Sequence, residues 1–147
     1  MRLTTFTDYC LRALIFVALK DDGGLATIDE IAQHHAINRN HLVKVVFRLS
    51  QLGYLQTLRG KGGGIRLADD PANLNLGKLI RQTEQGFSLV ECFQERDCHC
   101  VIEPACVLKG ALRAALDAFF DVLDGYTLAD LVKPSRNLAR LLSVPAV

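Results

Sequence analysis

The chain has 147 residues, half of them hydrophobic, and a formal net charge of +1 at pH 7. This length fits one compact unit or a small domain with an oligomerisation appendage, and the apolar content excludes a disordered chain. An apolar run near the start, residues 13–19, is too short to span a membrane and lacks a signal-peptide cleavage site. We therefore expect a cytoplasmic protein with no membrane partner.

The first fifty residues or so predict three helices. The first begins among threonines that can cap it and ends near Lys20, before the stretch DDGG at 21–24. Thr27 caps a short second helix, with Glu30 as the partner that a capping box requires. A third helix spans about 39–53, with a glycine at its end and a basic outer face. Two helices joined by a few residues, the second longer and basic, are typical of a helix-turn-helix.

Two strand segments follow the third helix, at residues 54–58 and 65–67. The stretch RGKGGG between them supplies the backbone freedom of a hairpin turn. A helix-turn-helix followed at once by a basic hairpin predicts a winged helix.

The second half of the chain predicts a long helix behind a cysteine-rich loop. An amphipathic helix covers about 76–85, the loop follows, and Pro104 suits the first turn of a helix that runs to about Asp124. This helix is apolar on more than one side, so we expect it to pair with its copy in a homodimer. Its predicted apolar stripes are Leu108, Leu112, Ala115, Phe119 and Leu123 on one side and Ala111, Ala114 and Ala118 on another.

The middle of the chain is basic and carries the predicted DNA contacts. No Asp or Glu occurs from Ile31 to Ala68, which makes a solvated face for protein contacts the weaker interpretation. Lys and Arg there supply contacts to the phosphates of double-stranded DNA, and Asn and Arg suit bidentate reading of adenine and guanine. The predicted DNA-binding residues are Asn38, Arg39, Asn40, His41, Lys44, Arg48, Arg59, Lys61 and Arg66.

Four of the five cysteines lie within residues 92–106, with the spacing C-x5-C-x-C-x5-C. Zinc sites usually carry two C-x2–4-C knuckles, and this segment has none. Thiolates on a loop suit an iron–sulfur cluster, and a thiol switch is the other interpretation for a reducing compartment. His99 is interpreted as a loop residue, and Cys10, on an apolar helix, as a buried thiol.

Four stretches of the chain, taken together, resemble a known family. They are LTTFTDYCLRALIFVAL, NRNHLVKVVFRLSQLGYLQTLRGKGGGIRLA, CVIEPACVLKGAL and LDGYTLADLV. They are similar to the NsrR family of nitric-oxide-sensing repressors, within the wider group of IscR-like winged-helix iron–sulfur regulators. The resemblance implies a homodimer that holds one cluster per subunit and represses genes for nitric oxide detoxification. It also implies that nitrosylation of the cluster releases the operator DNA.

The resemblance further implies the cluster ligands. Cys100 and Cys106, in CVIEPAC, match the family's last two cysteine ligands, and Cys92 after SLVE matches the first. Asp8, in FTDY, matches the aspartate that the partner subunit contributes as the fourth ligand. Cys98 is an extra thiol in this chain, so it stays an alternative to Cys100 as the middle ligand. Such a ligand set could hold a 4Fe-4S or a 2Fe-2S cluster.

The expected fold class is therefore mainly α with a small β-wing, a winged helix-turn-helix domain plus a long dimerisation helix. The expected parts are the DNA-binding domain at 1–85, the cluster-binding loop at 86–106, the dimerisation helix at 104–125 and a C-terminal helical tail at 126–147.

The expected function is that of a non-enzymatic repressor of the helix-turn-helix type. It binds an operator in double-stranded DNA and responds to nitric oxide through its iron–sulfur cluster. The alternatives are an IscR-like regulator that senses cluster supply, a thiol-redox-sensing regulator and, more remotely, an electron-transfer iron–sulfur protein. The last alternative predicts no salt-dependent DNA binding, and the sequence offers no catalytic pair for a redox enzyme.

Overall fold

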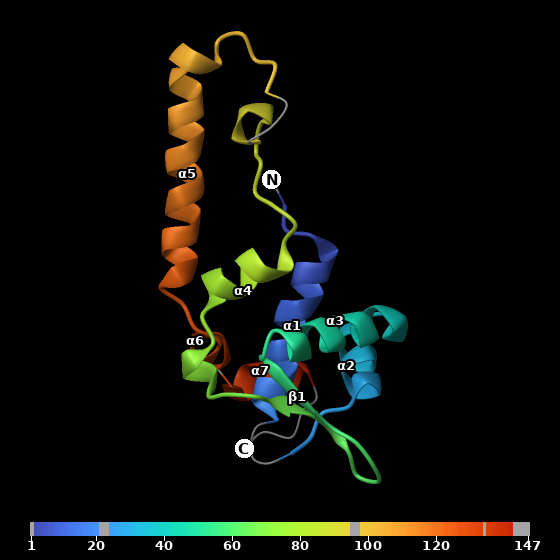
Figure 1. Cartoon of the computed structure of the whole chain (residues 1–147). Helices are drawn as coiled ribbons and strands as arrows, with labels where there is room; N and C mark the ends of the chain where they lie inside the picture. Colours follow the sequence, from blue (N-terminus) through green and yellow to red (C-terminus); the bar gives the residue numbers. More distant parts are fainter. Residues whose placement is uncertain (1, 21–23, 95–97, 134, 143–147) are drawn as a thin grey trace.

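Figure 1 shows the computed structural model of the chain, which describes residues 2–20, 24–94, 98–133 and 135–142. Parts of the predicted first-helix end, cysteine loop and C-terminal tail (21–23, 95–97, 134 and 143–147) lie outside the described residues. The helices are α1 (Thr5–Leu19), α2 (Ile28–His35), α3 (Arg39–Gln51), α4 (Leu76–Thr83), α5 (Val107–Asp124), α6 (Leu128–Val132) and α7 (Ser135–Leu141). The strands are β1 (Leu55–Leu58) and β2 (Gly64–Leu67), and the short 3-10 turns are η1 (Pro71–Asn73), η2 (Glu91–Phe93) and η3 (Glu103–Ala105).

The described chain is mainly helical, with one two-stranded antiparallel sheet, which confirms the expected fold class. The helix pair α2–α3 is followed directly by the hairpin β1–β2, the order of a winged helix-turn-helix. Figure 1 shows α5 as a long helix that extends away from this group, with the cysteine-rich loop at its far end. We call α1–α4, the hairpin, α6 and α7 the body, and the described residues of 86–124 the arm.

Polar residues cap the starts of the first three helices, and the sequence predicted such caps for the first two. The Thr4 side chain accepts a hydrogen bond from the Thr7 backbone N–H at 3.3 Å. Thr27 and Glu30 form the predicted capping box, with the Thr27 N–H donating to Glu30 at 2.7 Å. The Asn38 side chain caps α3. These bonds satisfy backbone N–H groups that have no partner inside their own helix.

The turn between the two strands depends on glycine. The strands pair in an antiparallel register that ends at Leu58↔Gly64. Between them, Gly60 and Gly62 have φ values of +105° and +79°, a region that other residues rarely adopt. The stretch RGKGGG therefore forms the predicted hairpin turn.

The core of the body lies around α1. Phe16 and Leu14 of α1 are fully buried together with Ile31 of α2 and with Leu42 and Leu49 of α3. Full burial of one such side chain contributes about 1.5–3 kcal/mol. This packing fixes α3 against α1, so a displacement of α1 reaches the second helix of the helix-turn-helix.

The arm contacts the body along one side of α5. Leu116 and Phe120 are the buried residues of α5 and pack with Ile80 of α4. Neither belongs to the apolar stripes predicted from the sequence, whereas Leu108 and the predicted alanines of α5 are exposed. The prediction that α5 is apolar on more than one side is confirmed, and the side that packs on α4 is centred on Leu116 and Phe120, with Phe119 and Leu123 of the first predicted stripe beside them. No described helix, α5 included, is long and apolar enough to cross a membrane.

A set of close contacts fastens the end of α5 to α4. The Arg81 guanidinium donates two hydrogen bonds to the Asp124 carboxylate, at 2.6 and 2.8 Å, and these lower the pKa of Asp124. The Asn75 side chain donates to the Asp124 carbonyl at 2.7 Å. A Cβ atom added to Gly77 would lie 1.9 Å from Asp124 Oδ1. We call these four residues the joint, because they set how the arm leaves the body.

Candidate metal centre and nucleic-acid interface

The predicted thiol ligands all lie in the loop that joins α4 to α5 (Figure 1). Cys92 lies in η2, Cys98 and Cys100 follow in irregular backbone, and Cys106 is the residue before the first turn of α5. All four are free thiols, Cys98 is exposed and the other three are half-buried. Free, accessible thiols are the chemical state that a metal or cluster ligand requires.

Backbone and ring contacts fold this loop back toward α5. The Glu91 carboxylate accepts a hydrogen bond from the His99 backbone N–H at 2.7 Å. The Arg113 guanidinium of α5 lies over the Phe93 ring, 4.1 Å from its centroid. A cation over an aromatic face is attracted by the ring quadrupole. Both ends of η2 are therefore tied, one to the later part of the loop and the other to α5.

Lys109 lies in the first turn of α5, directly after the last cysteine of the loop. It forms an ion pair with Glu103 of η3, and the hydrogen bond to this carboxylate raises the pKa of Lys109. Sequence reasoning missed Lys109 and Arg113, and the signal was their four-residue spacing directly after the last cysteine.

Asp8, the predicted partner-subunit ligand, lies in the body. It stands in the first turn of α1, its side chain is 44% exposed, and its carboxylate pairs with Arg12 Nε at 2.9 Å. In the described part of one chain, no three His, Cys, Asp or Glu side chains are close enough together to hold a metal ion. The donor chemistry of thiols and carboxylate fits an iron–sulfur cluster, but the described residues do not bring the predicted ligands together as one group.

The start of α1 is also held against the end of α4. The Thr7 hydroxyl donates to Thr83 at 3.0 Å in a buried position, and the Thr4 backbone N–H donates to the Glu84 carboxylate at 2.8 Å. Asp8 is therefore carried on a helix end that is fixed to the same helix, α4, that supports the arm.

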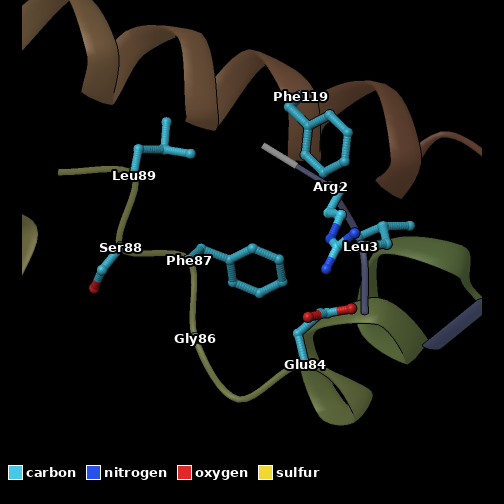
Figure 2. A pocket seen from close by; sticks show the side chains of 8 residues that line it. All are labelled: Arg2, Leu3, Glu84, Gly86, Phe87, Ser88, Leu89 and Phe119. Carbon is cyan, nitrogen blue, oxygen red and sulfur yellow. The ribbon is translucent and has the colours of Figure 1, made fainter. Parts of the chain in front are cut away.

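A cavity of about 430 Å³ lies between the start of the chain, the segment after α4 and α5 (Figure 2). Figure 2 shows the Phe87 and Phe119 rings beside it, with Arg2 and Glu84 at its polar side. None of the predicted cluster ligands lines this cavity. It marks a place where the arm and the N-terminal segment of one chain do not fill the space between them.

The predicted DNA-binding residues lie on α3 and on the hairpin, and several are engaged inside the chain. Asn38 caps α3 by accepting from the Asn40 backbone N–H at 2.8 Å. Arg39 Nε forms an ion pair with Asp29 at 2.7 Å, and Arg48 donates to the Gln82 carbonyl at 3.4 Å. These contacts orient the side chains and reduce the free positive charge of Arg39.

The remaining predicted DNA-binding residues are exposed. Arg66 donates to the Gln56 side chain across the hairpin at 2.9 Å. His41 stacks with Tyr9 of α1 at a centroid distance of 6.2 Å. Exposed side chains at the start of α3 and at the hairpin tip can reach a duplex together, the arrangement that a winged helix uses. Asn40, Lys44, Arg59 and Lys61 are exposed as well.

The chain is similar to known transcriptional regulators. The profile of the Rrf2 family, described as iron-dependent transcriptional regulator, matches residues 3–134. The HTH-type transcriptional regulator NsrR of Bacillus subtilis is 51% identical over 144 residues, 98% of this chain and 99% of that protein. Among solved structures, CymR, the global cysteine regulator of B. subtilis, has a TM-score of 0.73 and 30% identity, covering 89% of this chain and 95% of that one. The T. potens IscR structure has a TM-score of 0.73 at 24% identity, covering 92% of this chain and 88% of that one, so it shares the fold.

Proposed function

Since the chain belongs to the Rrf2 family and is a DNA-binding transcriptional regulator, we propose that it is a nitric-oxide-responsive repressor with one iron–sulfur cluster per subunit. The family relationship confirms the resemblance inferred from the four sequence stretches. On this proposal the protein acts by binding rather than by catalysis, as a homodimer on operator DNA in the cytoplasm.

The observation that carries the proposal is the set of four free thiols in one loop that leads into α5. Cys92, Cys100 and Cys106 are the proposed ligands, and the partner subunit's Asp8 is the proposed fourth. The cluster, when bound, supplies iron that reacts with nitric oxide. Cys98 is an exposed free thiol in the same loop, so it stays the alternative middle ligand.

An exposed seam on α5 supports the proposed homodimer. Leu108 and Val122 are each 62% exposed, and three of the exposed alanines between them lie on the same stripe. A spacing of three and four residues in alternation places apolar side chains along one stripe that suits helix pairing. Val101 and Val107, beside Cys106, are 94% and 86% exposed, so a partner that pairs with α5 would also cover apolar surface near the thiols. The seam residues are Leu108, Ala111, Ala115, Ala118 and Val122.

The proposed mechanism uses the chain's own contacts to couple the loop to DNA. With Asp8 engaged by the loop of the other subunit, α1 of one subunit is tied to the arm of its partner. When Asp8 is released, its carboxylate has Arg12 as an alternative partner within the same helix. Because α1 packs on α3, this exchange changes the spacing of the two α3 helices of the dimer. A coupling free energy of about 1–3 kcal/mol changes operator affinity roughly 5–150-fold.

The test is spectroscopy of anaerobically purified protein before and after nitric oxide, with binding to a duplex selected from a random pool followed in parallel. We expect visible absorbance that nitric oxide alters and a matching loss of DNA affinity. Cys106→Ser should abolish the visible absorbance and the effect of nitric oxide on DNA affinity. Cys10→Ala, which removes a thiol outside the loop, should keep the absorbance and the effect. A colourless protein that binds its duplex equally with and without nitric oxide would contradict the proposal.

Single substitutions assign the ligands. If Cys100 is the middle ligand, Cys100→Ser loses the visible absorbance and Cys98→Ser keeps it, and the reverse result assigns Cys98. Asp8→Ala should change the spectrum and the nitric oxide response, with Asp117→Ala on the exposed side of α5 as the matched control. If the Asp8→Ala protein has an unchanged spectrum and an unchanged nitric oxide response, Asp8 is not a ligand.

A second candidate, a thiol switch, is favoured by one observation. Cys92 and Cys98 are free thiols in the same loop, and Cys98 is exposed to oxidants. In this case a disulfide between the two sulfur atoms, formed by an added oxidant such as a low-molecular-weight disulfide, changes DNA affinity in a protein without iron. Mass spectrometry of the oxidised apo-protein distinguishes the two candidates.

A further inference from the structure

Two large apolar side chains are exposed on α3, the second helix of the helix-turn-helix. Val43 is 40% exposed and Phe47 is 63% exposed. They stand four residues apart, so they lie next to each other on one side of the helix. Single exposed apolar residues are common, but a neighbouring pair on one helix face is a feature that needs a cause.

Packing within the chain does not explain why Val43 and Phe47 are both apolar and exposed. The buried side of α3 is made by Leu42, Val45, Val46 and Leu49, which pack into the core of the body. Phe47 projects from the opposite side of the helix, where Asn40 and Lys44 are also exposed. An exposed phenylalanine at this position adds little to the stability of the isolated chain.

The surroundings of the pair favour DNA over a protein partner. Lys44 and Asn40 flank it, and no Asp or Glu occurs from Ile31 to Ala68, so the face carries positive charge without acids from this part of the chain. The exposed side of the second helix is the surface that a helix-turn-helix places in the major groove. There, an A·T pair presents the C5-methyl group of thymine, the apolar feature of that groove.

Resting on the proposed DNA-binding function, we propose that Val43 and Phe47 contact thymine methyl groups and so help to select the operator. Asn40, one to two turns earlier on the same face, suits hydrogen bonding to an adenine edge. Lys44 suits a phosphate or a guanine edge. The half-site recognised by the middle of α3 is therefore expected to contain thymines at fixed positions, next to bases read by polar groups.

The test replaces thymine by deoxyuridine, which removes only the methyl group and keeps every hydrogen-bonding atom. The full-length protein, purified anaerobically, is given a duplex that it has itself enriched from a random pool, with each thymine replaced in turn. At contacted positions we expect the affinity to fall about fourfold for each methyl group that the side chains bury. In the Phe47→Ala and Val43→Ala proteins, replacement of thymine by deoxyuridine should leave the DNA affinity unchanged at the position that the removed side chain contacted.

A wing variant serves as the matched control. Lys61 lies at the exposed hairpin tip, so Lys61→Ala should weaken binding to all duplexes and lower the salt dependence by about one phosphate contact. Its discrimination between thymine and deoxyuridine should be unchanged. Because Phe47 is exposed, Phe47→Ala should keep the wild-type melting temperature, which separates lost recognition from lost folding.

The outcomes separate this inference from the proposed function. If the protein enriches no duplex, the proposed function fails and this inference fails with it. If the protein enriches a duplex but deoxyuridine lowers the affinity at none of the thymine positions, only this inference is overturned. It is also overturned if the methyl dependence survives in both variants, or if Phe47→Ala changes the oligomeric state and leaves discrimination intact.

Discussion

The body and the arm contain similar apolar residues and cysteines in opposite surroundings. In the body, Phe16, Ile31 and Cys10 are each completely buried. In the arm, Val101 and Val107 are almost fully exposed, and the four loop cysteines are accessible or half-buried. The body therefore completes its core within one chain, whereas the arm carries apolar surface and thiols arranged for contact with something else. The buried thiol of Cys10 and the thiols of the proposed ligands are separated in the same way.

The largest contrast is in thiol reactivity. Burial raises the pKa of the Cys10 thiol to about 12, so at pH 8 its reactive thiolate fraction is roughly a thousandfold below that of an ordinary cysteine. We expect iodoacetamide to label the loop cysteines of iron-free protein while Cys10 stays unlabelled, as peptide mass spectrometry can measure. In denaturant Cys10 should react like the others. If native Cys10 is labelled as fast as Cys98, the thiols of the body and the arm do not differ in reactivity.

The second contrast is in what truncation does to stability. Phe16→Ala removes a fully buried ring from the body, so we expect the free energy of unfolding to fall by about 3–5 kcal/mol. Val101→Ala, at a side chain that is 94% exposed, should change it by less than about 0.5 kcal/mol in the monomer. Urea unfolding at low protein concentration measures both. Equal losses would mean that the arm is packed against the body more closely than its exposure indicates.

The third contrast lies within α5, between its seam and its opposite side. Ala115→Arg places a charge in the middle of the proposed seam, and burial of unpaired charge should weaken the dimer by about 3 kcal/mol, roughly a hundredfold. Asp117→Arg introduces the same side chain on the opposite side and should leave the dimer intact. Analytical ultracentrifugation over a concentration series measures the dissociation constant. If the Ala115→Arg protein dimerises with the wild-type dissociation constant, the interface does not include the seam.

Much of the body could be predicted from the sequence, because its signals are local. Threonines before apolar periodic runs, a Glu three residues after Thr27 and clustered glycines each fix backbone geometry within a few residues. The capping box, the helix-turn-helix and the hairpin follow from such patterns. The buried thiol of Cys10 follows from its apolar neighbours and is confirmed.

The arm was harder to predict because its contacts join residues far apart in sequence. Helical periodicity indicated that α5 is apolar on several sides, but nothing local says that Leu116 and Phe120 are the side that meets α4. The same holds for Arg113, which lies over the ring of Phe93 from the loop before α5. The ligand role of Asp8 depends on a second subunit, and the ligand roles of Asp8 and the cysteines stay predictions.

The smallest expected effect concerns the joint between the two regions. A Cβ on Gly77 would lie 1.9 Å from Asp124 Oδ1 and 2.9 Å from Arg81 Nη1, so Gly77→Ala must displace this ion pair. The exposed pair itself contributes little because solvent screens it, but the shift also disturbs Leu116 and Phe120, which pack beside it. We expect Gly77→Ala to lower the free energy of unfolding by about 1–2 kcal/mol, as urea titration can measure.

Gly110 provides the matched control, because it lies in α5 and a Cβ there meets nothing within 4 Å. Gly110→Ala should stabilise the protein by up to about 1 kcal/mol through helix propensity, the opposite sign to Gly77→Ala. Since Arg81 lowers the pKa of Asp124, the pair's contribution is present above the ordinary aspartate pKa of about 3.9 and is lost as pH falls through the lowered folded value. The destabilisation by Gly77→Ala should therefore shrink at acidic pH and in an Asp124→Ser background. If Gly77→Ala stabilises the protein as Gly110→Ala does, the contacts of Asp124 do not hold the arm, and the proposed coupling of the loop to α3 would have to pass through α1 alone.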